Sequence, residues 1–127
     1  MRFLRTYIPT IISLMVIGII CLAPISDMPS IVSAAKIPHF DKFVHAFSFL
    51  LLAIIAWADT RKYTGKRDRA YIVSVLLSVI YGGLIEIIQD FTNTRSSDIL
   101  DWIADITGMA TGIAIIVAWR KLGTYQN

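Results

Sequence analysis

Three short groups of ionisable residues lie at the ends of long apolar stretches in this sequence. They are DKFVH (residues 41–45), EIIQ (86–89) and RSSDILDWIAD (95–105). Their carboxylate, imidazole, ammonium and guanidinium groups can bind a charged headgroup, transfer protons or ligate a metal. A charge exposed to lipid at the centre of a span costs at least ~2.5–3.5 kcal/mol. These groups are therefore expected to face one another or water, and not acyl chains.

The composition indicates an integral membrane protein. Of the 127 residues, 56% are hydrophobic and 17% are charged. A soluble domain of this size buries only part of its chain and could not cover so much apolar surface. We predict a single domain, residues 1–127, that folds as an all-α four-helix bundle in the membrane. Four stretches of about 18–21 residues are long enough to cross a ~30 Å hydrocarbon core. These expected spans cover about residues 7–26, 41–58, 70–89 and 99–119.

The basic residues predict the orientation of the bundle. Nine of the 12 lysines and arginines lie in the two terminal segments and in the loop at 60–69. Basic residues accumulate on the cytoplasmic side of membrane proteins, so both termini and this loop are expected in the cytoplasm. The first span could instead be a cleaved signal peptide, because Arg2 and Arg5 precede it. However, the VSA sequence that resembles a cleavage site (32–34) lies well past the apolar run, so a retained span is preferred.

Helical periodicity places the polar residues of each span on one face. His45, Glu86 and Asp105 also lie at a similar depth, roughly 5–9 Å below the outer boundary of the membrane. We therefore expect three helices to build one polar pocket near the outer surface. The predicted ligand-binding residues are Asp41, Lys42, His45, Glu86, Gln89, Arg95, Asp98, Asp101 and Asp105.

Structural roles could explain some of these residues. Asp41 and Asp98 stand where N-terminal helix caps are expected. A salt bridge from Arg95 to Glu86 or Asp101 would brace the bundle without any ligand. Capping does not explain Glu86, which lies near the C-terminal end of its span, where the helix dipole disfavours an anion.

Acidic residues outnumber basic residues at the predicted outer end. Some carboxylates must be protonated, hydrated or balanced by a cation. A metal held by Asp41, His45, Glu86 and Asp101 is conceivable, because hard cations take carboxylate oxygens. No metal site and no cofactor is assigned from the sequence.

At these residues the sequence resembles the VanZ-like family, whose pattern is D-K-x-x-H, then E-x-x-Q, then R and D-x-x-x-N/D-x-x-G. The resemblance covers about residues 38–112 and departs at Asp105, where family members usually carry Asn. It implies a bacterial multi-pass protein of the cytoplasmic membrane. The family name comes from a member associated with tolerance of the glycopeptide teicoplanin. The positions that match the family motif are Asp41, Lys42, His45, Glu86, Gln89, Arg95 and Asp101.

Three functions stay open at this point. The preferred function is binding of an envelope ligand, which would be a membrane lipid headgroup, a lipid-linked cell-wall precursor or a glycopeptide, with a contribution to antibiotic tolerance. Lys42 and Arg95 would then be the anchors. The second is an enzyme acting on a lipid-linked substrate, with His45 or Glu86 as general base, although no HExxH, GxSxG or phosphate-loop motif is present. The third is a structural or transport subunit, for which four short spans would require an oligomer. No nucleic-acid partner is expected.

Overall fold

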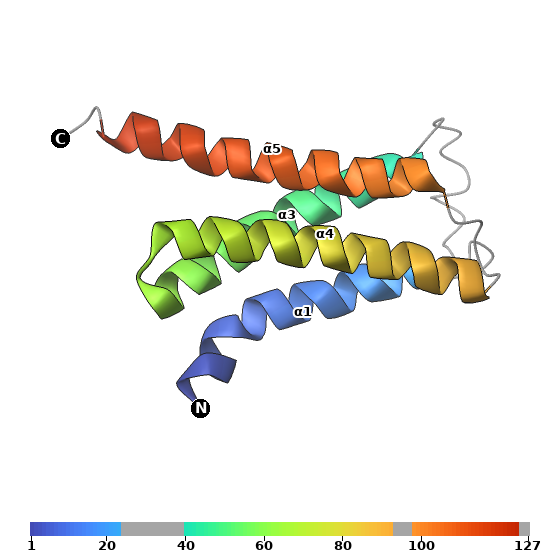
Figure 1. The fold of residues 1–127 in the computed structure, drawn as a ribbon, viewed down its shortest axis with the longest axis horizontal. Helices are drawn as coiled ribbons and strands as arrows, with labels where there is room; N and C mark the ends of the chain where they lie inside the picture. The colour runs from blue at the N-terminus through green and yellow to red at the C-terminus, as the bar shows by residue number, and fades with distance from the viewer. Residues whose placement is uncertain (24–39, 93–97, 125–127) are drawn as a thin grey trace.

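The computed structural model describes residues 1–23, 40–92 and 98–124, and these fold into long helices (Figure 1). All of these helices are long and apolar enough to cross a membrane. The predicted all-α class is therefore confirmed, and the described residues form four helices of the length and composition expected for a multi-pass membrane protein. The helices are α1 (Arg2–Leu22), α3 (Phe40–Thr64), α4 (Arg67–Thr92) and α5 (Ile99–Thr124).

The helices differ from the predicted spans at their ends. Helices α3, α4 and α5 continue past the apolar stretches, because the arginines and lysines that flank these stretches extend a helix about as readily as leucine does. Helix α1 begins at Arg2 and ends at Leu22. Ala23 is extended (φ −63°, ψ 135°), as expected for a residue that precedes proline. Residues 24–26 of the predicted first span lie outside the described part of the chain.

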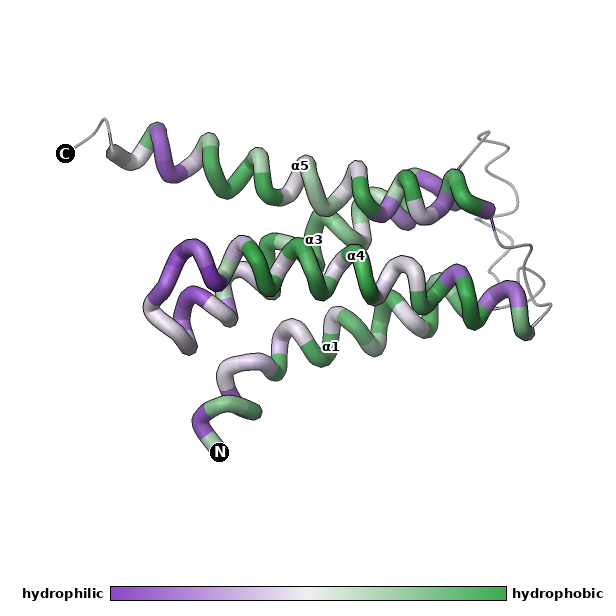
Figure 2. The backbone as a smooth tube through the Cα atoms, viewed as in Figure 1, coloured by the Kyte–Doolittle hydropathy of each residue, from purple (hydrophilic) through white to green (hydrophobic). Residues whose placement is uncertain are grey.

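The surface and the interior have the polarity expected of a membrane protein. Many large apolar side chains are exposed, such as Phe47, Ile80 and Trp119, which a soluble protein of this size would not tolerate. Conversely, His45 and Asp105 are fully buried. Figure 2 shows the same division along the chain, with apolar helix centres and hydrophilic residues at the α3–α4 turn and at the helix ends.

Helix α3 is the central element of the bundle. It packs against α1, α4 and α5, whereas α1 and α5 do not contact each other within the described residues. A two-residue turn joins α3 to α4 and makes them antiparallel. Gly65 in this turn has φ +69°, the left-handed conformation that ends many helices and that glycine adopts without strain. The N-terminus, the α3–α4 turn and the C-terminal end of α5 lie at the same end of the bundle (Figure 1).

A buried carboxylate holds α1 against α3 at this end. Asp59 Oδ2 accepts the backbone N–H of Thr10 at 3.1 Å and its hydroxyl at 2.6 Å. Pro9 precedes Thr10 inside the helix and cannot donate a backbone hydrogen bond, so it weakens the helix locally. Helix α1 bends in this region (Figure 1). Asp59 therefore stabilises the weakened turn and docks it on α3.

Two glycines bring the backbones of α3 and α5 into direct contact. They are Gly108 and Gly112 of the GMATG sequence, a GxxxG pattern that favours close helix packing. A Cβ at Gly108 would lie 1.9 Å from Ala46 O, and a Cβ at Gly112 would lie 2.7 Å from Leu50 O. Because these oxygens belong to the backbone of α3, no side-chain rotation could make room.

We predict that Gly108→Ala destabilises the bundle by roughly 3 kcal/mol, because α3 and α5 must separate to admit the methyl group. Gly123→Ala is the matched control, because nothing lies within 4 Å of a Cβ at Gly123 and alanine favours the helix. Thermal unfolding of both variants in detergent would test this prediction. An unchanged midpoint for Gly108→Ala would contradict the close approach of the two helices.

Candidate functional site

Lys42, in the first turn of α3, joins α3 to the start of α5. Its Nζ lies 2.8 Å from both Asp98 Oδ2 and Asp101 Oδ1, and 3.5 Å from Asp41 Oδ2. Asp98 also caps α5, because its Oδ1 accepts the backbone N–H of Leu100 at 2.9 Å. We call Lys42, Asp98 and Asp101 the lysine bridge. Its ammonium group is satisfied by carboxylates of the protein, so Lys42 is not presented as a separate cation to a ligand.

A buried His–Asp pair lies one turn deeper in the bundle. His45 Nδ1 is 2.9 Å from Asp105 Oδ1, and each side chain is 1% exposed. Helix α4 makes room for this pair at Gly82, where a Cβ would lie 2.8 Å from Asp105 Oδ2. Three helices therefore meet around one carboxylate.

Glu86 of α4 completes a group that we call the inner cluster, which consists of His45, Glu86 and Asp105. Glu86 Oε2 accepts the backbone N–H of Asp98 at 3.2 Å. One oxygen of each carboxylate and one nitrogen of the imidazole all lie within 4.8 Å of one another. The polar faces of α3, α4 and α5 thus converge, which is the arrangement expected from their helical periodicity.

Several polar atoms in and beside the inner cluster are buried and have no hydrogen-bond partner in the structure. A buried polar atom without a partner costs roughly 1–3 kcal/mol, so most such atoms in proteins bind water, an ion or a ligand. Most of the atoms here are acceptors, which favours a cation or a group that donates hydrogen bonds. They are His45 Nε2, Ser78 Oγ, Glu86 Oε1, Gln89 Oε1 and Asp105 Oδ2.

A groove between α4 and α5 leads to Glu86 from the outside of the bundle. It has a volume of about 340 Å³ and is lined by Gly83, Glu86, Ile99 and Trp102. Ile99 is 64% exposed, and the indole N–H of Trp102 points to Val79 O at 3.4 Å. The groove therefore offers apolar walls beside one carboxylate.

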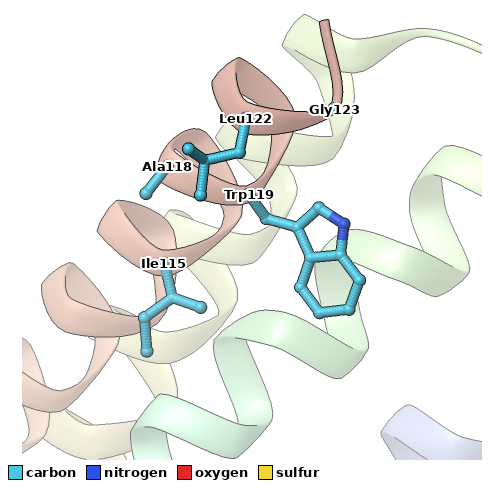
Figure 3. Close-up of a pocket in the computed structure, with 5 residues that line it drawn as sticks. All are labelled: Ile115, Ala118, Trp119, Leu122 and Gly123. Atoms are coloured by element: carbon cyan, nitrogen blue, oxygen red, sulfur yellow. The ribbon is translucent and has the colours of Figure 1, made fainter. Parts of the chain in front are cut away.

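Two further hollows lie at the opposite end of the bundle. One is formed by α5 alone, where Trp119 projects from the helix beside Ile115 (Figure 3). The other lies between α3 and α5 and is lined mainly by apolar side chains, with Trp57 and Arg120 at its edge. Neither hollow is lined by a carboxylate. The inner cluster and its groove are therefore the candidate site.

The structure places most of the predicted site residues in two groups. The lysine bridge, with Asp41 beside it, and the inner cluster hold seven of them. Gln89 is buried and donates its Nε2 hydrogen to Cys21 O at 2.7 Å, so it ties α4 to α1. Arg95 lies outside the described residues, and so does the predicted bridge from Arg95 to Glu86 or Asp101. The structure instead gives Asp101 a bond to Lys42.

Other residues of the site were not in the predicted set. Helical spacing places Ser78 and Gly82 on the same face of α4 as Glu86, but they were not counted as ligand-binding residues. Trp102 lines the groove beside Glu86. The sequence gives no signal for this role, because it does not show which helix the indole faces.

Comparison with known proteins identifies the family. A sequence model described as VanZ/LLP1 matches residues 4–120. The chain belongs to the VanZ/LLP1 family. This match extends beyond the motifs at 38–112 on which the resemblance was based. No solved structure matches the chain.

The chain is also similar to an uncharacterized protein of Schizosaccharomyces pombe. The two are 29% identical over 90 residues, which cover 69% of this chain and 53% of the yeast protein. The chain thus spans about half the length of that relative. Because this relative is eukaryotic, proteins similar to this chain are not confined to bacteria.

We predict that Lys42→Met destabilises this VanZ/LLP1 protein by about 1–3 kcal/mol, because it leaves the nearly buried carboxylate of Asp101 without a cation. Lys42→Arg should recover part of the loss. Lys62→Met, an exposed site at the far end of the same helix, is the control. Denaturation in detergent gives the three stabilities. If Lys42→Met is as stable as the control, the lysine bridge does not stabilise the fold.

Proposed function

We propose that this protein binds the headgroup of a membrane-embedded amphiphile at the end of the bundle that carries the lysine bridge and the inner cluster. The observation that carries this proposal is the groove between α4 and α5. It joins the apolar side chains of Ile99 and Trp102 to Glu86, whose Oε1 is buried without a hydrogen-bond partner. An apolar wall beside a polar acceptor matches the two parts of an amphiphile.

The charges of this end favour a ligand that donates hydrogen bonds. Among the residues that the structure describes here, Lys42 is the one lysine or arginine, and it is bonded to Asp98 and Asp101. Glu86 therefore gains little from it. An ammonium group could bind Glu86 and lie against the face of the Trp102 indole, which attracts cations. Glu86 therefore replaces Lys42 as the proposed anchor of the ligand.

The distribution of basic residues supports an outward-facing site. The N-terminus, the basic α3–α4 turn and the C-terminal end of α5 share one end of the bundle (Figure 1). If that end is cytoplasmic, Glu86 faces the outer side. Lipid headgroups, lipid-linked cell-wall precursors and glycopeptides are ligands of this side that carry amino or hydroxyl groups. A role in antibiotic tolerance would follow if the ligand is a drug or its target.

The His45–Asp105 pair supports a second function, acid–base catalysis on a lipid-linked substrate. An imidazole hydrogen-bonded to a carboxylate, with Glu86 nearby, is a donor set that can move protons. Incubation of the purified protein with lipid-linked precursors, followed by mass spectrometry, separates the two functions. A catalyst would return a converted product, whereas a binding protein would return the precursor unchanged.

We predict that the protein retains phosphatidylethanolamine in preference to phosphatidylcholine, whose quaternary ammonium cannot donate a hydrogen bond. Glu86→Gln should reduce this preference roughly ten-fold, because a hydrogen bond to a charged group contributes about 1.5–3 kcal/mol. Native mass spectrometry of protein released from mixed vesicles would measure it. Asp68→Asn, at the opposite end of α4, is the control. Equal retention of both lipids by the unmodified protein would contradict binding of an ammonium group at Glu86.

A further inference from the structure

We infer that the inner cluster is a binding site for a divalent first-row transition-metal ion. His45, Glu86 and Asp105 each offer one ligand atom, and these three atoms lie within 4.8 Å of one another. The three residues come from α3, α4 and α5, so folding brings them together, and no local sequence motif contains them all. This inference goes beyond headgroup binding, because it requires no amphiphile, and the metal ion and the ammonium group are alternative occupants of the Glu86 carboxylate.

The donor atoms match the chemistry of such an ion. Imidazole nitrogen and carboxylate oxygen are both ligands of Zn²⁺, with bonds of ~2.0–2.2 Å. Two ligands of a tetrahedral ion are then roughly 3.3–3.6 Å apart. His45 Nδ1 and Asp105 Oδ1, which are hydrogen-bonded at 2.9 Å, would separate slightly and release their shared proton to admit the ion. Mg²⁺, Ca²⁺ and Mn²⁺ suit sites made of oxygen ligands, so the imidazole favours Zn²⁺.

Unpartnered atoms point to an occupant of the cluster. His45 and Asp105 are each 1% exposed, yet His45 Nε2, Asp105 Oδ2 and Glu86 Oε1 have no hydrogen-bond partner. The Cys21 thiol of α1 is a further neighbour of the imidazole, but it does not belong to the group within 4.8 Å. Helices α3, α4 and α5 therefore each leave a buried polar atom of the cluster without a partner.

Charge balance also favours a divalent ion. Two carboxylates with a neutral imidazole carry two negative charges, which one M²⁺ ion neutralises. The nearest described ammonium group, that of Lys42, already bonds to Asp98 and Asp101.

The surrounding residues hold the ligands in place. Gly82 leaves space for the carboxylate of Asp105, and the backbone N–H of Asp98 orients Glu86 by bonding to Oε2. Three protein ligands leave at least one coordination position open, as in catalytic zinc sites. Glu86 also lines the groove between α4 and α5, so a ligand oxygen could reach that position.

Metal binding by the full-length protein tests the inference directly. Protein without an affinity tag, stripped with EDTA in detergent, would be titrated with Zn²⁺, Mn²⁺ and Mg²⁺ by calorimetry, and its metal content measured after desalting. We expect one Zn²⁺ per chain, weaker Mn²⁺ binding, no Mg²⁺ binding and a higher melting temperature with Zn²⁺. X-ray absorption of the zinc complex should show nitrogen and oxygen ligands.

Isosteric variants identify the ligands. Asp105→Asn and Glu86→Gln should each weaken Zn²⁺ binding at least ten-fold, whereas Asp90→Asn, on the turn of α4 that follows Glu86, should leave it unchanged. The unmodified protein decides the question even if a variant fails to fold. Failure of the stripped protein to bind Zn²⁺ at 100 µM, or binding that Asp90→Asn weakens as much as Asp105→Asn does, would overturn the inference.

Discussion

Charged side chains inside a membrane-spanning bundle are stable only when another helix supplies their partner, and the structure depends on this constraint. Lys42 of α3 is bonded to Asp98 and Asp101 at the start of α5, and His45 of α3 is bonded to Asp105 one turn deeper. Removing one member of such a pair leaves an uncompensated charge, which costs more than the pair contributes. The polar contacts therefore fix how α5 sits on α3. Gly108 and Gly112 act together with these contacts, because they bring the backbones of α3 and α5 close enough for the side chains to meet.

The same constraint divides the polar residues into two layers with different roles. In the lysine bridge, the ammonium group and both carboxylates are bonded to one another, which is what a structural brace requires. In the inner cluster, His45, Glu86 and Asp105 retain buried atoms without partners. A brace would not need such atoms, because each one lowers stability. This difference is why we assign binding to the inner layer and stabilisation to the outer one, although both layers lie at the same end of the bundle.

Much of this arrangement could be predicted from the sequence, because periodicity and depth are local properties. Helical spacing placed His45, Glu86 and Asp105 on inward faces at one level, and the structure brings them together. The pairing could not be predicted, since it depends on how the helices rotate against each other. The sequence favoured Lys42 as an anchor for a ligand, whereas two carboxylates of α5 occupy it. Asp59 was not among the predicted residues, because its bond to Thr10 crosses from α3 to α1 and no pattern within one helix reveals it.

The central claim is that ionisable groups of separate helices meet one another inside the bilayer. Magic-angle-spinning NMR in liposomes tests it most directly, by the dipolar coupling between the imidazole ¹⁵N of His45 and the carboxyl ¹³C of Asp105. His39→Gln leaves His45 as the one histidine of the chain and removes ambiguity. The account predicts a coupling that corresponds to direct hydrogen-bond contact, in keeping with the 2.9 Å between Nδ1 and Oδ1. A protein that is folded in the bilayer and shows no such coupling would contradict it.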